Sequence, residues 1–268
     1  MYFNRDNRKL TFAAGALALG VLVGAAYLEK KPTTDVVVGS DGKSRAVEQP
    51  GASKRLLVVE VDASASGADQ RRLLDQRLQT IVAAAKHRRA GVEVWAIDDA
   101  TNVHREPLAT AAFDPGVDNP NAPLPAGTAQ RFVDDVTRAI DARKLSNGTD
   151  MPGALVLLTD RRRQAGRGVE VHGLLITDGI SSVPKCDFGL VPLEESTFEA
   201  TARACLAEQN VALGGMTVYL AAVGQDTSGA EDVNVLGAAP RLLEHLVTVG
   251  GGKPRAVNLD VPNGGFAA

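Results

Sequence analysis

Short apolar runs alternate with amphipathic stretches along most of this chain. Residues 55–62 and 91–98 read RLLVVEVD and GVEVWAID, and such runs are typical of strands that a parallel sheet buries on both faces. Between them, residues 68–89 carry Leu, Ile and Val on one stripe and most of their charges off it, which predicts an amphipathic helix. A strand, a helix and a second strand therefore follow one another.

The same alternation continues to the end of the chain. We expect further helices over residues 128–145, 151–164, 198–209 and 236–249. We expect further strands within residues 103–113, 168–179, 216–223 and 255–261. This order predicts a three-layer, Rossmann-like α/β domain in which helices cover both faces of a mainly parallel sheet. Ligands of such sheets bind at the carboxyl ends of the strands, so we expect the chemistry of this chain at that edge.

The beginning of the chain has a different pattern. Residues 10–28 contain no charged side chain, and a helix of that length, rising about 1.5 Å per residue, roughly spans a hydrocarbon core. The next residues mix Lys, Pro, Thr, Ser, Gly and Asp without apolar periodicity, as expected of a linker. We therefore expect a short tail over residues 1–9, one transmembrane helix over 10–28, a flexible spacer over 29–54 and one domain over 55–268.

A cleaved signal peptide is the alternative for residues 10–28. The basic residues Arg5, Arg8 and Lys9 precede the apolar run, and small residues near its end offer a cleavage site. The run is longer than the usual apolar core of a signal peptide, about 7–15 residues, which favours an uncleaved anchor. Either interpretation implies export of the domain. With the anchor uncleaved, we expect a single-pass membrane protein whose domain is extracytoplasmic.

Two pairs of residues bear on how this helix sits in the membrane. Lys30 and Lys31 nearly balance the basic residues before the helix, so the positive-inside rule leaves both orientations open. Gly20 and Gly24 have the GxxxG spacing that lets two helices approach closely. A homodimer through these glycines is therefore a secondary expectation.

Composition narrows the classes of function. The chain is 44% hydrophobic and 23% charged, which is ordinary for a globular domain with a sizeable core. Aromatic residues make up only 4% and the net charge is −3; stacking surfaces and a domain-wide basic footprint, the marks of nucleic-acid binding, are therefore not expected. The two cysteines, Cys186 and Cys205, suggest one disulfide in an exported domain, whereas in the cytosol they would be two buried thiols.

Oxygen-bearing side chains follow the expected strands. Asp62, Ser64 and Ser66 come directly after the first strand with the spacing Asp-x-Ser-x-Ser, and Asp178 ends a later strand before a glycine. Thr149 lies in a loop just before a helix. Carboxylates and hydroxyls are hard oxygen donors of the kind that Mg²⁺ binds, six at a time and at about 2.0–2.1 Å. The serine motif alone is short and could simply cap the next helix, so the signal rests on all three segments together.

In this order the three segments resemble those of the von Willebrand factor A domain family. VEVDASAS is similar to the family's first metal motif, NGTDMPGAL to its threonine motif and LLITDGISS to its second aspartate motif. The resemblance covers residues 55–252, most of the chain after the spacer, and implies the family's three-layer fold with a metal-ion-dependent adhesion site.

The resemblance also implies a role for each residue. Ser64 and Ser66 would bind the metal directly, Thr149 would do so when the site is engaged, and Asp62 and Asp178 would act largely through water. The implied ion is Mg²⁺, with Mn²⁺ or Ca²⁺ as the other choices. An Asp or Glu of a partner protein would complete the coordination. Two carboxylates leave a dication close to neutral, so it can still attract that acid.

The expected function is therefore a membrane-anchored binding module for adhesion or complex assembly rather than an enzyme. One alternative is a structural scaffold of an envelope complex that needs no ion. Another is a Mg²⁺-dependent phosphohydrolase with Asp62 as nucleophile, although Ser64 stands where such an enzyme would carry its general acid.

Other charged and titratable residues give weaker signals. The four histidines are scattered, without the i, i+4 spacing of a helical zinc pair; they are His87, His104, His172 and His245. Arg161, Arg162 and Arg163 end an expected helix, where cations interact favourably with the helix dipole. We interpret these arginines as a solvated helix end rather than a phosphate-binding or partner-binding patch.

Overall fold

The computed structural model describes two compact units, residues 1–47 and 48–268. The described residues are 54–64, 74–104, 106–113, 126–143, 146, 148–191, 194–223 and 233–260, with the backbone of 36–38 and 44–46. In the first unit β1 (Val36–Val38) and β2 (Ser44–Ala46) form an antiparallel pair within the expected spacer.

The expected anchor, residues 10–28 with Gly20 and Gly24, lies outside the described residues. Within the part of the chain that is described, no helix has the length and apolar character needed to cross a membrane.

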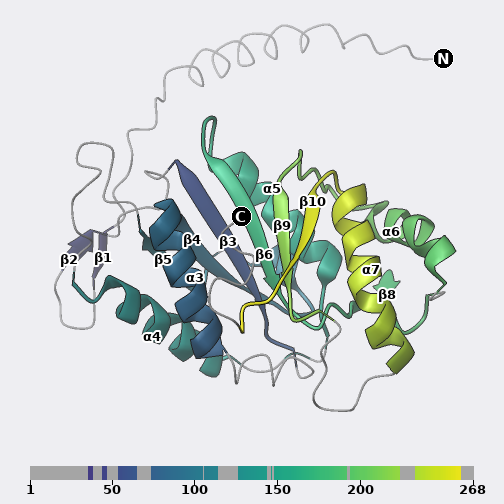
Figure 1. Ribbon diagram of the computed structural model, residues 1–268, viewed down its shortest axis with the longest axis horizontal. Coiled ribbons are helices and arrows are strands. Elements are labelled where there is room, and N and C mark those ends of the chain that lie inside the picture. Colours follow the sequence, from purple (N-terminus) through teal and green to yellow (C-terminus); the bar gives the residue numbers. More distant parts are fainter. Residues whose placement is uncertain are drawn as a thin grey trace, which may run out of the picture. The chain divides into compact units, whose positions relative to one another are not determined.

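A six-stranded sheet forms the centre of the second unit (Figure 1). Its strands, in spatial order, are β10 (Lys253–Val257), β9 (Thr217–Ala221), β6 (Glu170–Ile176), β3 (Arg55–Asp62), β4 (Gly91–Ile97) and β5 (Ala109–Ala112). Neighbouring strands are parallel except β4 and β5, which are antiparallel. The expectation of a mainly parallel sheet is therefore confirmed.

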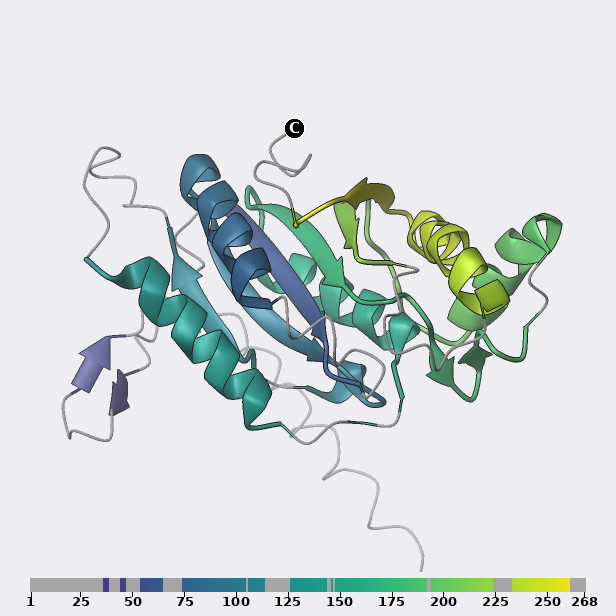
Figure 2. The ribbon, with the colours of Figure 1, turned by 60° about the horizontal axis from the view of Figure 1, so that its bottom comes forward.

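Helices cover both faces of this sheet (Figures 1 and 2). On one face lie α3 (Leu74–Arg88) and α4 (Thr128–Asp141), and on the other α5 (Met151–Gln164), α6 (Phe198–Leu206) and α7 (Val233–Val249). Successive side chains of a strand point to opposite faces. Accordingly, β3 gives Leu57, Val59 and Val61 to one core and Leu56 and Val58 to the other.

The strand order creates a switch point beside β3. From β3 the chain adds β4 and β5 on one side, and it then returns to build β6, β9 and β10 on the other. In sheets wound this way, a crevice forms where the order reverses, outside the carboxyl ends of the two strands concerned. Here those strands are β3 and β6, which end next to the segments that carry Asp62 and Asp178.

The sequence did not indicate the shortest elements. These are β7 (Ser182–Val183) and β8 (Cys186–Asp187), which form a small hairpin, and the 3₁₀ turns η2 (Thr101–Val103) and η3 (Glu195–Thr197). Strands of two residues are too short to show a period-2 pattern.

Arg161 is not the solvated helix end that we expected. Its Nε lies 2.6 Å from Oε2 of Glu93, and its Nη2 lies 2.5 Å from Oε1 of the same carboxylate. The guanidinium also lies 5.6 Å from the centre of the Trp95 ring. Arg161 therefore joins the end of α5 to β4 through a largely buried ion pair.

Candidate metal centre

Asp62 and Asp178 leave the sheet side by side. Asp62 is the last residue of β3, and Asp178 follows β6 by two residues. The two strands are paired in register up to Val61 and Ile176. Both carboxylates are fully buried. Two acidic side chains therefore lie inside the protein at the switch point of the sheet.

Both oxygens of Asp62 accept hydrogen bonds. The backbone N–H of Ser64 donates to Oδ1 across 2.8 Å, and the Thr177 hydroxyl donates to Oδ2 across 2.8 Å. The first bond closes the turn after β3, and the second joins that turn to the end of β6. Ser64, the next expected ligand, is consequently held against Asp62 and is itself buried.

The turn that presents Asp178 requires a glycine. The backbone N–H of Ile180 donates to Oδ1 of Asp178 across 2.9 Å. Between these residues Gly179 has φ +85°, and a Cβ there would lie 2.5 Å from Cγ1 of Val223. Both the backbone conformation and the close contact disfavour larger residues, so the turn that follows Asp178 depends on this glycine.

Hydrogen bonds from the hairpin fix the backbone of Thr149. Its N–H donates to the Ser182 hydroxyl across 2.9 Å, while its carbonyl accepts from the Ser182 N–H at 3.0 Å and the Ser181 hydroxyl at 3.3 Å. Because Ser181 and Ser182 follow Asp178 closely in sequence, the threonine segment is attached directly to the second aspartate segment. Thr149 itself is buried.

Further bonds attach the threonine segment to β3 and β4. Ser146 forms a parallel bridge with Ser64, and its N–H donates to the carbonyl of Ala63 across 3.3 Å. The N–H of Asp150 donates to the carbonyl of Asp98 across 2.8 Å. Three segments that are far apart in sequence thus meet at one edge of the sheet.

Asp150 fixes the start of α5 immediately after Thr149. Its Oδ1 accepts a hydrogen bond from the N–H of Gly153 at 2.8 Å, as an N-cap does. A Cβ at residue 153 would lie 2.1 Å from Oδ2 of Asp150, so the capping carboxylate occupies the space that a glycine leaves.

The environment of Asp62 makes this carboxyl group harder to ionise than an ordinary one. Burial and, to a smaller extent, the neighbouring charge of Asp178 raise the pKa of Asp62 to about 6, although hydrogen bonds from Ser64 and Thr177 oppose the shift. The charge that acts on Asp62 is thus another carboxylate. Two adjacent buried carboxylates repel each other, and a bound cation would relieve that repulsion.

A third acid lies beneath this pair. Glu60 precedes Asp62 by two residues on β3 and is fully buried. Burial raises its pKa well above the ordinary value, and the charge of Asp150 adds to the shift. The environment favours an uncharged Glu60. For Asp150, burial and the charge of Asp98 raise the pKa, while the Gly153 N–H opposes them.

Sequence reasoning missed the cluster around Asp98. This residue directly follows β4, and its Oδ2 lies 2.8 Å from Nη2 of Arg143 and 2.8 Å from Nε2 of His104. Like Asp62, Asp98 lies at the end of a buried strand, and this position could have marked it as a residue at the functional edge of the sheet. Its partners were not predictable, because they come from a distant loop and a 3₁₀ turn.

The structure brings Asp62, Ser64, Thr149 and Asp178 to one edge of the sheet, and Ser66 lies outside the described residues. Among the described residues, no group of three or more His, Cys, Asp or Glu could hold a metal ion. The expected site would use only two carboxylates, and its other donors are hydroxyls. This donor set is chemically suited to Mg²⁺.

The hairpin that holds Thr149 is itself covalently attached. Cys186 of β8 and Cys205 of α6 form a disulfide with an S–S distance of 2.08 Å. Hydrogen bonds join Ser182 of β7 to Thr149, and β7 pairs with β8. The disulfide therefore connects α6 to the edge of the candidate site.

The remaining histidines have separate environments. His172 lies 2.9 Å from Oε1 of Glu170, His245 packs its ring against Phe198, and His87 is exposed on α3.

Neither protein-family models nor curated proteins match this chain.

Proposed function

We propose that the second unit is a von Willebrand factor A-like domain that binds Mg²⁺ through Asp62, Ser64, Ser66, Thr149 and Asp178. With the ion bound, it captures an Asp or Glu side chain of a partner protein. The domain is tethered to a membrane by residues 10–28 and serves adhesion or complex assembly. Mn²⁺ and Ca²⁺ are alternative ions.

The observation that carries this proposal is the pair of buried carboxylates at the switch point. Asp62 and Asp178 are fully buried on adjacent strand ends, and the charge of Asp178 helps to raise the pKa of Asp62. Moving one ionised carboxylate away from water is costly, and placing two together is more so unless a cation compensates them. A dication would offset both charges and lower the pKa of Asp62 again.

The hydroxyl donors support the same ion. Ser64 is held by its backbone against Asp62, and Thr149 is held by backbone bonds to Ser182. The hydroxyls of Ser64 and Thr149 would add neutral oxygen ligands without adding charge. Mg²⁺ accepts such a mixture, because it binds few carboxylates and retains several waters.

The surrounding charges favour an acidic partner. Asp98 is neutralised by its ion pair with Arg143, and burial favours an uncharged Glu60. A dication with Asp62 and Asp178 would therefore be close to neutral overall. It would keep enough Lewis acidity to accept one more carboxylate, which the partner supplies.

Titration of the full-length protein with Mg²⁺ and Mn²⁺ by calorimetry tests the site. We expect one ion to bind per chain, and we expect Asp62→Asn and Asp178→Asn to abolish binding. Asp135→Asn is the matched control, because it removes an exposed carboxylate on α4. If all three variants bind the ion as the wild type does, the proposed site is wrong.

Capture of partners tests the binding role. Full-length protein is used to pull down partners with Mg²⁺, with EDTA, and as Asp62→Asn. Capture that requires both Mg²⁺ and Asp62 supports the proposal. Capture that is unchanged by EDTA indicates the metal-independent scaffold.

A phosphohydrolase is less compatible with the geometry. Asp62 is fully buried, and both of its oxygens accept hydrogen bonds, so a phosphoester in solution cannot reach it without rearrangement. Phosphate release from generic phosphoesters that is lost in Asp62→Asn would revive that alternative.

A further inference from the structure

Basic side chains gather at the edge of the sheet opposite the candidate metal centre. This edge comprises the starts of the parallel strands and the turns that lead into them. Six of the exposed basic residues that the structure describes there are named here the basic surface: Lys54, Arg55, Lys86, Arg89, Arg167 and Lys253. Lys54 precedes β3 and Arg55 begins it. Lys86 and Arg89 precede β4, Arg167 precedes β6, and Lys253 begins β10.

The extent of the basic surface follows from the sheet order. It runs from the start of β10 to the start of β4, across β9, β6 and β3. Neighbouring strands lie about 4.8 Å apart, so the surface is about 20 Å wide. That width exceeds the Debye length of about 8 Å at physiological ionic strength. The basic surface therefore suits an extended anionic surface better than a single charged group.

Acidic side chains offset only part of the charge of the basic surface. Glu170 lies at the same edge and accepts a bond from Arg55 at 3.2 Å, and it also contacts His172. Glu93 is buried and paired with Arg161. The whole chain nevertheless has a net charge of −3. A group of basic side chains thus lies at one edge of a protein whose net charge is negative, while the carboxylates of the candidate metal centre lie at the other edge.

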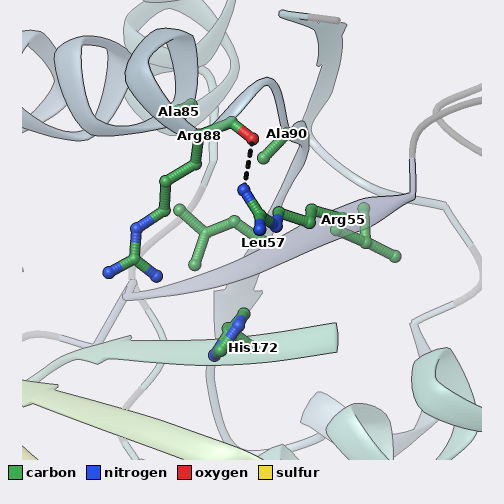
Figure 3. Close-up of a pocket in the computed structure, with 7 residues that line it drawn as sticks. Arg55, Leu57, Ala85, Arg88, Ala90 and His172 are labelled. Atoms are coloured by element: carbon green, nitrogen blue, oxygen red, sulfur yellow. Dashed lines mark hydrogen bonds between the residues drawn. The ribbon is translucent and has the colours of Figure 1, made fainter. Parts of the chain in front are cut away.

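Among the described residues, the hollow at the centre of this edge is too small for an organic ligand. Figure 3 shows Arg55, Arg88 and His172 around a hollow beneath the end of α3, with Arg55 bonded to the carbonyl of Arg88. The hollow measures about 10 Å³, which is barely enough for one water molecule. A ligand at this edge would therefore lie on the protein rather than inside it.

We propose that the basic surface docks the domain on the anionic headgroups of the membrane that anchors it. This inference rests on the tether of the proposed function. The expected anchor ends at residue 28, and the chain that follows enters the domain at Lys54, within the basic surface itself. Anionic headgroups attract clustered Lys and Arg side chains. Docked this way, the domain turns its metal edge away from the bilayer and toward a partner.

Amine labelling of the full-length chain in lipid nanodiscs tests this orientation. One set of discs contains phosphatidylcholine only, and the other also contains phosphatidylglycerol. Acetylation rates are measured by mass spectrometry at Lys54, Lys86 and Lys253. Lys185 is an internal control, because it is exposed on the β7–β8 hairpin and paired with Glu208. EDTA is present throughout, so failure of the metal site cannot change the result.

We expect the anionic discs to slow acetylation of the three lysines about fivefold or more and to leave Lys185 unchanged. About 1 M salt, where the Debye length is about 3 Å, should abolish the protection. Each basic residue near an anionic surface increases the equilibrium constant for docking by a factor of about five. The triple variant Lys54→Glu, Lys86→Glu and Arg167→Glu should therefore dock about a hundredfold less, as read at Lys253. Reversal of the exposed residues Arg138 and Arg203 to Glu should have no such effect.

Three results would overturn the proposal. One is equal labelling of the three lysines in both kinds of disc, and another is failure of the discs to retain the full-length chain. The third comes from adding a DNA oligonucleotide to the neutral discs. If the oligonucleotide protects the lysines in a salt-sensitive way and phosphatidylglycerol does not, the surface binds nucleic acid instead.

Discussion

Thr177, just after β6, donates a hydrogen bond from Oγ1 to Oδ2 of Asp62 at the end of β3, across 2.8 Å. The Gly179 N–H donates to the same hydroxyl across 3.0 Å, so the single hydroxyl proton is directed to Asp62. Both residues are fully buried. The bond joins the two strands at the switch point and favours the ionised form of Asp62, so Thr177 acts as a positioning residue.

Thr177→Val should weaken binding of Mg²⁺ by about 10–100-fold, the usual effect of losing a partner that orients a metal ligand. The shape of the side chain is nearly preserved, but Asp62 loses the donor that favours its charge. Calorimetric titration of the full-length protein measures the change. Thr177→Ser retains the hydroxyl and should bind Mg²⁺ nearly as the wild type does. Equal affinity in the valine variant would show that the bond does not prepare Asp62 for the ion.

Stability of the metal-free protein should decrease as the pH rises. The pKa of Asp62 is about 6 in the folded protein and 3.8 for the ordinary carboxyl group, so the folded state holds this proton more tightly. The resulting stabilisation is complete below about pH 4 and is lost as the pH rises through 6. A difference of two pKa units corresponds to about 3 kcal/mol. Thermal unfolding in EDTA between pH 4 and 7 measures the loss.

Two comparisons isolate Asp62 in that measurement. Asp62→Asn cannot ionise, so its unfolding free energy should decline less over the same pH range. Saturating Mg²⁺ stabilises the charged carboxylates and should remove most of the decline in the wild type. A wild-type curve that matches the asparagine variant would contradict the assignment of the pH dependence to this residue.

The strands and the helix that carry the candidate site were predictable, because the patterns that indicate them lie within short stretches of sequence. The runs that became β3, β4 and β6 consist mainly of apolar residues, and burial on both faces of the sheet requires that. Helix α5 has the predicted bounds, Met151–Gln164, because Asp150 caps its first turn and a proline follows at the start of the helix.

The contacts that hold the site depend on tertiary structure and could not be read from the sequence. Ser182 lies in a two-residue strand, yet it fixes Thr149, which is 33 residues away. Asp98 meets Arg143 across 45 residues. Such pairs leave no periodic signal along the chain, because their partners are chosen by the packing of loops at the end of the sheet.

The disulfide should stabilise both the fold and the candidate site. Cys186 and Cys205 are separated by 19 positions, and closing a loop of that size contributes about 3 kcal/mol. We expect the double variant Cys186→Ala and Cys205→Ala to lose about that much unfolding free energy in urea. The affinity for Mg²⁺ should also decrease several-fold, because the hairpin would hold Thr149 less firmly through Ser182.

Ser182→Ala separates these two effects. It keeps the disulfide and removes the hydroxyl that accepts from the Thr149 N–H, so it should lower Mg²⁺ affinity with a smaller loss of stability, about 1 kcal/mol. Ser196→Ala, at an exposed serine of η3, is the control. If the double cysteine variant binds Mg²⁺ as tightly as the wild type, the hairpin does not transmit the effect.

The ion pair between Glu93 and Arg161 should be costly to break from one side only. The Glu93 side chain is 4% exposed and that of Arg161 is 22% exposed, and Glu93 also accepts a bond from Nε1 of Trp95 at 3.2 Å. Arg161→Met leaves a buried carboxylate without its cation, so we expect a loss of about 3–5 kcal/mol in urea unfolding. The double variant Glu93→Leu and Arg161→Met removes both charges and should recover much of that loss. A double variant as unstable as Arg161→Met alone would mean that the packing of the arginine on Trp95, rather than its charge, stabilises the end of α5 against β4.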